Sequence, residues 1–343
     1  MGSMKHEKCL PKKFYLEKIP IKKGVKKIKM KGIKKWVFGV CLVGVLASFI
    51  FLPALLAGNE KQADNPVAKR ERLENELRQM RKEMHANGWN FRIGPNPAMQ
   101  YSLEQLCGFK AELKPLDSCA YEPGDSAMMA ATLPASFVGT YTPIKNQASC
   151  GSCWAFSTIA GLEAAIKFKN GLTYDLSEQH LVSCNPWDWG CGGGFFAFDM
   201  IDAGNPYYPG AMPETCFPYT ALDSACAYCA SPTWYPAASW AYVGASNSVP
   251  AVDAIKTAIY TYGSVSAAVY VDRYFQAYTG GTFTTCRKKV SSCNHAIILC
   301  GWDDAKGAWL LKNSWGTGWG EAGFMWMKYG CNLVGYGACY AIY

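Results

Sequence analysis

One short stretch of the chain has the residue types of a reactive-thiol site. Residues 147–156 read QASCGSCWAF, and the second cysteine, Cys153, precedes a run of good helix formers with apolar residues at helical spacing. Asn170 and Gly171 follow that run and supply the expected stop signal. Cys153 is therefore predicted at a helix N-terminus, where unpaired backbone N–H groups and the helix dipole favour a thiolate. The same CxxC pattern could instead serve as a redox dithiol or as half of a zinc site.

A nucleophilic thiol needs a base, and the chain offers four histidines: His6, His85, His180 and His295. The first two precede the cysteine stretch. The third is expected on the polar side of a short helix that Ser177 caps. That leaves His295, in the apolar run 294–302, which is predicted to be a buried strand. Such a histidine could be an ordinary core residue, so its assignment as the base depends on the neighbouring motifs.

Three segments in this order resemble the active-site segments of the papain and cathepsin family of cysteine proteases. Cys150–Trp154 satisfies the family's C-G-[SA]-C-[WY] pattern, and His295 follows Cys153 by 142 residues (295 − 153), a separation typical of the family. Residues 309–320, WLLKNSWGTGWG, are similar to the segment whose asparagine, here Asn313, orients the histidine. The resemblance implies a cysteine peptidase made as a bacterial-type exported precursor.

The resemblance implies a role for each residue of this set. Cys153 and a protonated His295 would form a thiolate–imidazolium pair that attacks the peptide carbonyl. Asn313 would orient the histidine ring, and Trp315 would shield their hydrogen bond from water. Gln147 and the backbone N–H of Cys153 would form the oxyanion hole. This chemistry requires no metal and no cofactor. The alternatives are a catalytically silent, membrane-anchored binding protein on the same scaffold and, more weakly, acyl transfer to an amine.

Substrate binding is predicted from a glycine-rich segment and the residues around it. The segment 190–194 is similar to the family's glycine-rich wall, where a peptide can pair with the enzyme backbone like an extra strand. The substrate-binding residues implied by the resemblance are Gly193, Gly194, Phe195, Phe196, Ala268, Asn294, Ala296 and Trp315. Cys339 is expected at the floor of the pocket. Because the pocket residues are small or apolar, we expect an endopeptidase that prefers a bulky apolar residue at the second position before the cut.

The net charge of +8 is concentrated at one end of the chain. Residues 1–35 hold 13 Lys and Arg and two acids, a net of +11, so the remainder carries −3 (8 − 11). We therefore expect no nucleic-acid partner. Residues 36–57 are almost wholly apolar and follow directly on the lysines, which predicts either a cleaved signal peptide or an uncleaved membrane anchor. In both cases the protein is exported, as a secreted, periplasmic or anchored form.

Residues 58–132 are predicted to be a propeptide and activation linker that inhibit the peptidase. Asn65 and Pro66 indicate a helix start, and apolar residues then repeat at four-three-four spacing: Leu73, Leu77, Met80 and Met84. A strand is expected at 89–93 and a capping box at 102–105. A short coiled-coil stalk is the alternative for the first helix. Residues 117–132 are expected to be an exposed linker.

Residues 133–343 are predicted to be the peptidase domain, a monomer that acts on peptide or protein substrates. The resemblance implies an α+β fold with a helical lobe and an antiparallel β-barrel lobe, with Cys153 and His295 on opposite walls of the cleft. Strands are expected within 264–271, 281–285, 294–302, 308–312 and 323–329.

The 12 cysteines from Cys150 onward predict a domain stapled by disulfides. The resemblance implies Cys150–Cys191, and pairs Cys184 with Cys216, Cys226 or Cys229. Cys331 is expected to pair with Cys286 or Cys293, and Cys300 is suggested to pair with Cys339. Without Cys153 the count is odd, so one thiol is expected to stay free or to pair with Cys119.

Overall fold

The computed structural model describes residues 65–113, 133–287 and 291–343. The chain divides into two units, Met1–Ala68 and Lys69–Tyr343, and the fold described below belongs to the second. The basic region 1–35, the apolar run 36–57 and the predicted linker 117–132 lie outside the described residues. Within the described ranges, no helix has the length and apolar character that a bilayer crossing requires.

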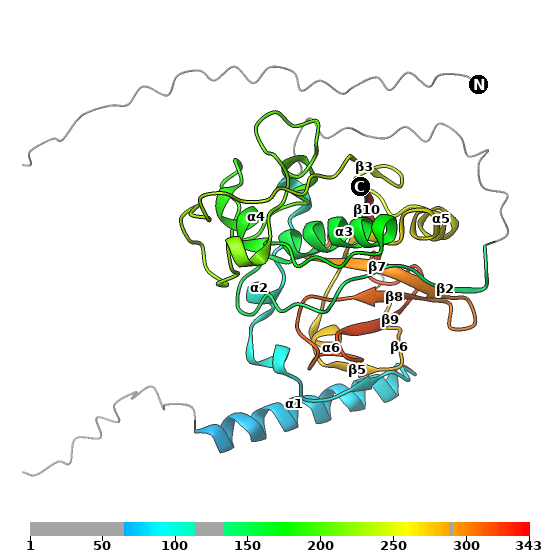
Figure 1. The fold of residues 1–343 in the computed structure, drawn as a ribbon. Coiled ribbons are helices and arrows are strands. Elements are labelled where there is room, and N and C mark those ends of the chain that lie inside the picture. The colour runs from blue at the N-terminus through cyan, green and yellow to red at the C-terminus, as the bar shows by residue number, and fades with distance from the viewer. Residues whose placement is uncertain (1–64, 114–132, 288–290) are drawn as a thin grey trace, which may run out of the picture. The chain divides into compact units, whose positions relative to one another are not determined.

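The longest helix of the peptidase region is α3 (Cys153–Asn170), which packs against the central strands of the sheet (Figure 1). Its end follows the sequence signals, because Gly171 adopts the left-handed conformation at φ 71° and closes the last turn. The other helices are α4 (Glu178–Cys184), α5 (Val252–Tyr262) and α6 (Arg273–Gln276), with short 3-10 turns at Phe198–Met200 and Glu214–Cys216. Helix α5 was not expected from the sequence, which predicted only strands in that half.

An eight-stranded sheet forms the second half of the fold. Its order is β3 (Ser239–Tyr242), β10 (Tyr336–Ile342), β4 (Val265–Val269), β7 (His295–Asp303), β8 (Ala308–Lys312), β9 (Phe324–Lys328) and β6 (Thr282–Phe283), and β2 (Ser136–Val138) pairs with β7. Neighbours are antiparallel except β6 and β9, which run parallel. All five expected strand regions contain a strand, whereas β2, β3 and β10 were not predicted.

The two faces of β4 belong to different hydrophobic clusters. Val265, Ala267 and Val269 join one cluster with β8 and β9, and Ala268 joins the other with residues of α3. Because side chains alternate across a strand, this single strand connects the cores of the two halves. It runs beside β7 in the sheet, and both strands are buried almost throughout.

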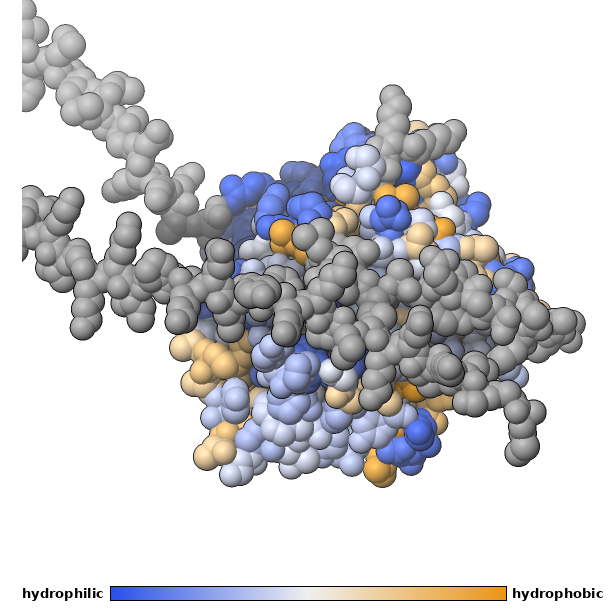
Figure 2. Space-filling view, turned by 90° about the horizontal axis from the view of Figure 1, so that it is seen from above, coloured by the Kyte–Doolittle hydropathy of each residue, from blue (hydrophilic) through white to orange (hydrophobic). Residues whose placement is uncertain are grey.

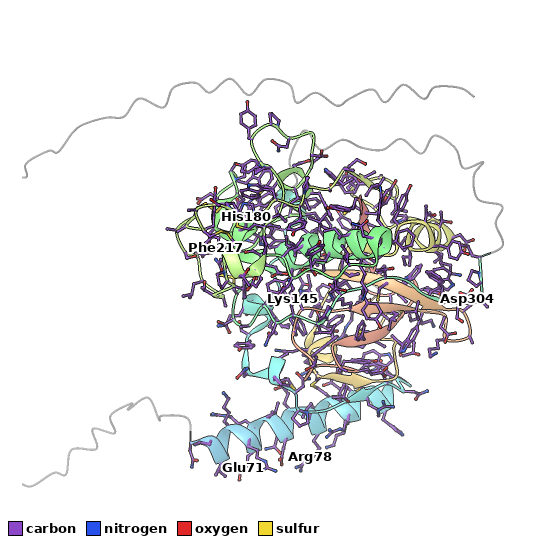
Figure 3. The ribbon with its side chains drawn as sticks, viewed as in Figure 1. Glu71, Arg78, Lys145, His180, Phe217 and Asp304 are labelled. Carbon is purple, nitrogen blue, oxygen red and sulfur yellow. A yellow bond between two sulfur atoms is a disulfide. The ribbon has the colours of Figure 1, made fainter. Side chains whose placement is uncertain are left out.

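The segment before the peptidase region folds onto it. It comprises α1 (Pro66–Ala86), β1 (Arg92–Ile93), α2 (Leu103–Leu106) and 3-10 turns at Pro97–Gln100 and Ala111–Leu113. Leu77, Met80 and Met84 of α1 are buried in the sheet-side cluster, and β1 pairs with β5 (Tyr278–Gly280). Glu71 and Arg78 point to the opposite side of α1 (Figure 3). Since the apolar stripe packs on its own chain, it does not serve a coiled-coil stalk.

Four disulfides are present among the described residues: Cys150–Cys191, Cys184–Cys226, Cys216–Cys229 and Cys286–Cys331. The suggested pairing of Cys300 with Cys339 is wrong, because these thiols lie on β7 and β10 and strand β4 separates the two. The expectation of a single leftover thiol is wrong as well, since Cys293 is also free.

The exposed surface of the described residues is mixed in character. On the face shown in Figure 2, blue hydrophilic residues alternate with small orange patches. The most exposed large apolar residues are scattered over several elements and loops: Val67, Val138, Leu172, Tyr207 and Leu222. Single exposed apolar side chains of this kind are normal and indicate no particular partner.

Candidate active site

Cys153 is the first residue of α3 and its side chain is fully buried. The disulfide between Cys150 and Cys191 fixes the turn that precedes it. Burial raises the pKa of the Cys153 thiol to about 11, while backbone N–H groups that point at the sulfur, from Ala296 and Gly108 among others, act in the opposite direction. The Gly108 nitrogen lies 3.3 Å from the sulfur. In this state the thiol is therefore neutral.

His295 and Asn313 are brought together by neighbouring strands. His295 begins β7 and Asn313 directly follows β8, and the histidine Nε2 lies 2.8 Å from the Asn313 Oδ1. The Trp315 ring packs 4.9 Å from the His295 ring, as the predicted shield would. Burial lowers the pKa of His295 to about 4, against the smaller raising effect of Asn313. An interaction with the Leu106 backbone also raises the pKa of His295, although the histidine Nδ1 makes no hydrogen bond of normal geometry within the described part of the chain.

Gln147 is buried beside the nucleophile, and its side chain is held at both ends. Its Nε2 donates to the carbonyl oxygens of Cys150 at 2.8 Å and Leu106 at 2.9 Å. Its Oε1 accepts a hydrogen bond from Ser314 Oγ at 2.7 Å. Since the amide oxygen accepts from Ser314, the amide nitrogen of Gln147 is directed to the opposite side, towards the Leu106 and Cys150 carbonyl oxygens. Ser314 was not singled out from the sequence, although its position next to Asn313 could have suggested it.

Residue 148 has an unfavourable backbone conformation for its type. Ala148 has φ 49°, in the left-handed region that glycine adopts without strain. Its backbone N–H donates to Asn146 Oδ1 at 3.0 Å. A glycine would adopt this conformation without strain, so alanine at this position costs stability.

The segment Leu106–Lys110, which precedes the peptidase region, lies against Cys153 and Gln147. We call it the occluding segment. Phe109 N donates to the Asn294 carbonyl oxygen at 3.0 Å. Gly194 N donates to the Gly108 oxygen at 2.8 Å, and Lys110 N donates to the Gly194 oxygen at 2.9 Å. The segment thus pairs with Gly194 as a short parallel strand. Nothing in the local sequence pattern indicated that it would lie here.

Gly193 and Gly194 of the glycine-rich segment 190–194 lie too close to neighbouring atoms to carry a side chain. A side chain on Gly193 would place its Cβ 2.6 Å from the Gly108 oxygen, and one on Gly194 would lie 2.9 Å from the Trp154 ring. Gly108 itself approaches Gly151 so closely that a Cβ would sit 1.7 Å from the Gly151 oxygen. The backbones of the wall and of the occluding segment therefore pack against each other directly.

Phe109 packs against residues that were predicted to bind substrate. Its ring lies 5.0 Å from the rings of both Phe195 and Phe196, and only 3% of the residue is exposed. The same hydrophobic cluster contains three further predicted pocket residues: Ala268, Ala296 and Cys339. The predicted substrate-binding residues thus come together around an aromatic side chain of the chain itself.

The prediction for His180 is wrong in one respect. Ser177 does cap α4, and its Oγ accepts from the His180 N–H at 3.0 Å. The ring, however, is buried against Tyr228 and Trp234 rather than solvated (Figure 3). The irregular segment that covers α4 is tied to it by the Cys184–Cys226 disulfide. Burial lowers the pKa of His180 to about 4.

Comparison with known proteins identifies the family. The family model described as "Papain family cysteine protease" matches residues 135–341, well over half of the chain, and the chain belongs to this family. It is 37% identical over 208 residues to pro-cathepsin H of Bos taurus, covering 58% of this chain and 59% of that protein. It is 31% identical over 287 residues to the oryzain gamma chain of Oryza sativa subsp. japonica, covering 80% and 76%.

Solved structures agree with this family and include precursors. Digestive procathepsin L 3 of the Tenebrio molitor larval midgut superposes with a TM-score of 0.64 at 26% identity, covering 80% of this chain and 90% of that one. The likeness extends beyond the matched domain, as expected for a chain that carries a propeptide. The resemblance inferred from the motifs and the predicted α+β fold are both confirmed.

Proposed function

We propose that the protein is an exported cysteine endopeptidase that is made as a zymogen. One observation carries this proposal: a segment of the chain's own N-terminal part occupies the peptide-binding surface above Cys153. Its backbone pairs with Gly194, and its Phe109 fills an apolar pocket. A surface that holds an extended segment in this way suits a peptide substrate once the segment leaves. Four disulfides and the basic and apolar N-terminal pattern support export.

The proposed reaction begins when Cys153 and His295 exchange a proton to form an ion pair. The thiolate attacks the substrate carbonyl, whose oxygen takes the place now held by the Leu106 oxygen, 2.9 Å from Gln147 Nε2. Such a donor stabilises the transition state by about 2.7–4 kcal/mol. His295, oriented by Asn313, then protonates the leaving amine. Water attacks the acyl-enzyme with the same histidine as its base.

We call the state in which the occluding segment covers Cys153 the closed state. Its electrostatics explain why the precursor would be inactive. Burial under the occluding segment raises the pKa of Cys153 and lowers that of His295, so both groups are held neutral. Departure of the segment admits water to both groups and removes this penalty. The helix N-terminus then favours the thiolate, as predicted from the sequence.

The pocket supports a preference for bulky apolar residues at the second position before the cut. Phe109 supports this preference, because its ring packs 5.0 Å from those of both Phe195 and Phe196. The predicted pocket residues Phe195, Phe196, Ala268, Ala296 and Cys339 are all small or apolar and buried, so an arginine among them would lose its hydration without gaining an ionic partner from them. If the apolar run 36–57 is retained, the enzyme is anchored to a membrane.

Labelling of the nucleophile tests the proposal against a catalytically silent binding protein. The fragment 133–343 is incubated with an epoxide-type thiol-protease inhibitor, and the intact mass is measured. We expect one adduct on the wild type, none on Cys153→Ala, and hydrolysis by the wild type alone. A His295→Ala fragment is expected to be comparably inactive because the two residues act as a unit. Hydrolysis by Cys153→Ala above a few per cent of wild type would overturn the assignment.

A fluorogenic dipeptide series tests the pocket. Substrates that differ only at the second residue before the cut are compared by kcat/KM. Phe-Arg and Leu-Arg are expected to be cleaved faster than Val-Arg, and Arg-Arg slowest. Faster cleavage of Arg-Arg than of Phe-Arg would contradict the pocket assignment.

A further inference from the structure

The occluding segment carries a cysteine of its own. Cys107 ends the short helix α2 and has no disulfide partner. It is half-buried, whereas the other free thiols of the described residues, Cys153, Cys293, Cys300 and Cys339, are all buried. Among the described residues, Cys107 is thus the free cysteine that is not fully buried as a residue.

Hydrogen bonding fixes Cys107 close to the nucleophile. The nitrogen of the next residue, Gly108, lies 3.3 Å from the Cys153 sulfur. That nitrogen is bonded to the Cys107 carbonyl carbon at about 1.33 Å, so the carbon lies within about 5 Å of the sulfur. The chain therefore places Cys107 next to the Cys153 sulfur, and the S–S bond would form when the two Cα atoms come to within about 4.4–6.8 Å, the usual range for a disulfide.

Hydrogen bonds of the residues on either side of Cys107 hold it at this position. Leu106 O accepts from Gln147 Nε2, and Phe109 N donates to Asn294 O. Cys107 thus lies between two anchored residues and cannot slide along the cleft. Burial raises the pKa of the Cys107 thiol, and a negative charge on Cys153 would raise it further, which is consistent with two thiols in one small space.

We propose that Cys107 and Cys153 form a reversible disulfide in the precursor, which holds the occluding segment covalently on the nucleophile until a thiol reduces it. The proposal rests on the function proposed above, because it assigns Cys153 as the nucleophile. It adds a second condition for activation, reduction, to the release of the segment.

The oxidant required is a low-molecular-weight disulfide such as glutathione disulfide. The Cys107 thiolate attacks one sulfur of this reagent, its S–S bond breaks, and one glutathione thiolate leaves. The Cys153 thiolate then attacks the Cys107 sulfur in the mixed disulfide and expels the second. The protons of the two protein thiols pass to the two glutathione thiolates. Two reduced thiols reverse the sequence and restore both cysteines.

The oxidised precursor would differ from the reduced one in two ways. The S–S bond keeps the occluding segment on Cys153 even when its hydrogen bonds to Gly194 and Asn294 open. The nucleophile is also protected from irreversible oxidation, because its sulfur is already engaged in a disulfide. Activation would therefore require both loosening of the segment and a reductant.

Peptide mapping of the full chain tests the disulfide directly. The purified full-length protein is equilibrated with glutathione disulfide, free thiols are alkylated, and the non-reduced digest is analysed by mass spectrometry. We expect a peptide pair that joins Cys107 to Cys153 and disappears after dithiothreitol. Recovery of both cysteines in alkylated form, or of Cys153 linked to another cysteine, would overturn the proposal.

Activation of the same protein gives a second test. The oxidised wild type is expected to hydrolyse no peptide substrate without dithiothreitol and to gain activity once it is added, because the Cys153 sulfur is held in the disulfide. Cys107→Ser should start equally fast in both conditions, whereas the control Cys300→Ser, also a free thiol, should behave as wild type. A reductant requirement that persists in Cys107→Ser would contradict the proposal. The peptide map does not depend on activity, so it separates this proposal from the proposed peptidase function.

Discussion

Replacing Phe109 by alanine tests whether the apolar pocket anchors the propeptide. The residue is 3% exposed, and its ring lies 5.0 Å from those of Phe195 and Phe196. Truncation of a buried phenylalanine costs about 3–5 kcal/mol. Because water enters the empty pocket when the segment leaves, we take the lower value, about 3 kcal/mol, which corresponds to roughly hundredfold weaker inhibition.

The assay is inhibition in trans. The fragment 58–132 is titrated against the fragment 133–343 with a fluorogenic substrate, and the inhibition constant is compared between variants. Phe109→Leu should lose less than about tenfold, since a nearly volume-conserving apolar change costs under about 1.5 kcal/mol. Val67→Ala is the control, because Val67 is 61% exposed. An inhibition constant for Phe109→Ala equal to that of the wild type would refute the reasoning.

Three further perturbations address the closed state, the oxyanion hole and the backbone. Burial lowers the pKa of His295 to about 4, and hydrogen bonds from Tyr274 and Arg273 lower that of Glu83 to about 2. Inhibition in trans should be strongest at neutral pH. It should weaken as the pH falls from about 6.5 to 4, because His295 then takes up a proton, and again from about 4.5 to 2, because Glu83 does. The second step should be absent in Glu83→Gln. Ser314→Ala frees the Gln147 amide to rotate, so kcat should fall about tenfold with KM nearly unchanged, and a larger change in KM would contradict the positioning role. Ala148→Gly should raise the free energy of unfolding in urea by about 1 kcal/mol, since Ala148 has φ 49°, and no gain would mean that the strain is relieved elsewhere.

The parts of the fold that follow local rules were predicted well from the sequence. The end of α3 at Gly171 depends on residues adjacent to the helix, and the capping box of Ser102 and Gln105 is present at α2. The four central site residues, Cys153, His295, Asn313 and Gln147, were predicted because motifs in chain order carry them. None of these inferences needed the arrangement of distant elements in space.

The predictions that were wrong or missing concern features that depend on contacts between distant parts of the chain. The strand order that separates Cys300 from Cys339 is not encoded near either residue. The burial of His180 comes from an irregular segment more than 40 residues later, which carries no periodic pattern. The path of Leu106–Lys110 is set by backbone hydrogen bonds, which cannot be predicted from the types of its side chains.

The direction of the occluding segment determines how long it can persist. Cys153 faces the N–H of Gly108, while the carbonyl of that residue is turned to the N–H of Gly194. The sulfur thus receives a backbone hydrogen-bond donor, which stabilises a thiolate and lowers its nucleophilicity. Maturation is therefore expected to begin with dissociation of this segment. The lifetime of the precursor is then set by a conformational rate and not by the rate of bond cleavage.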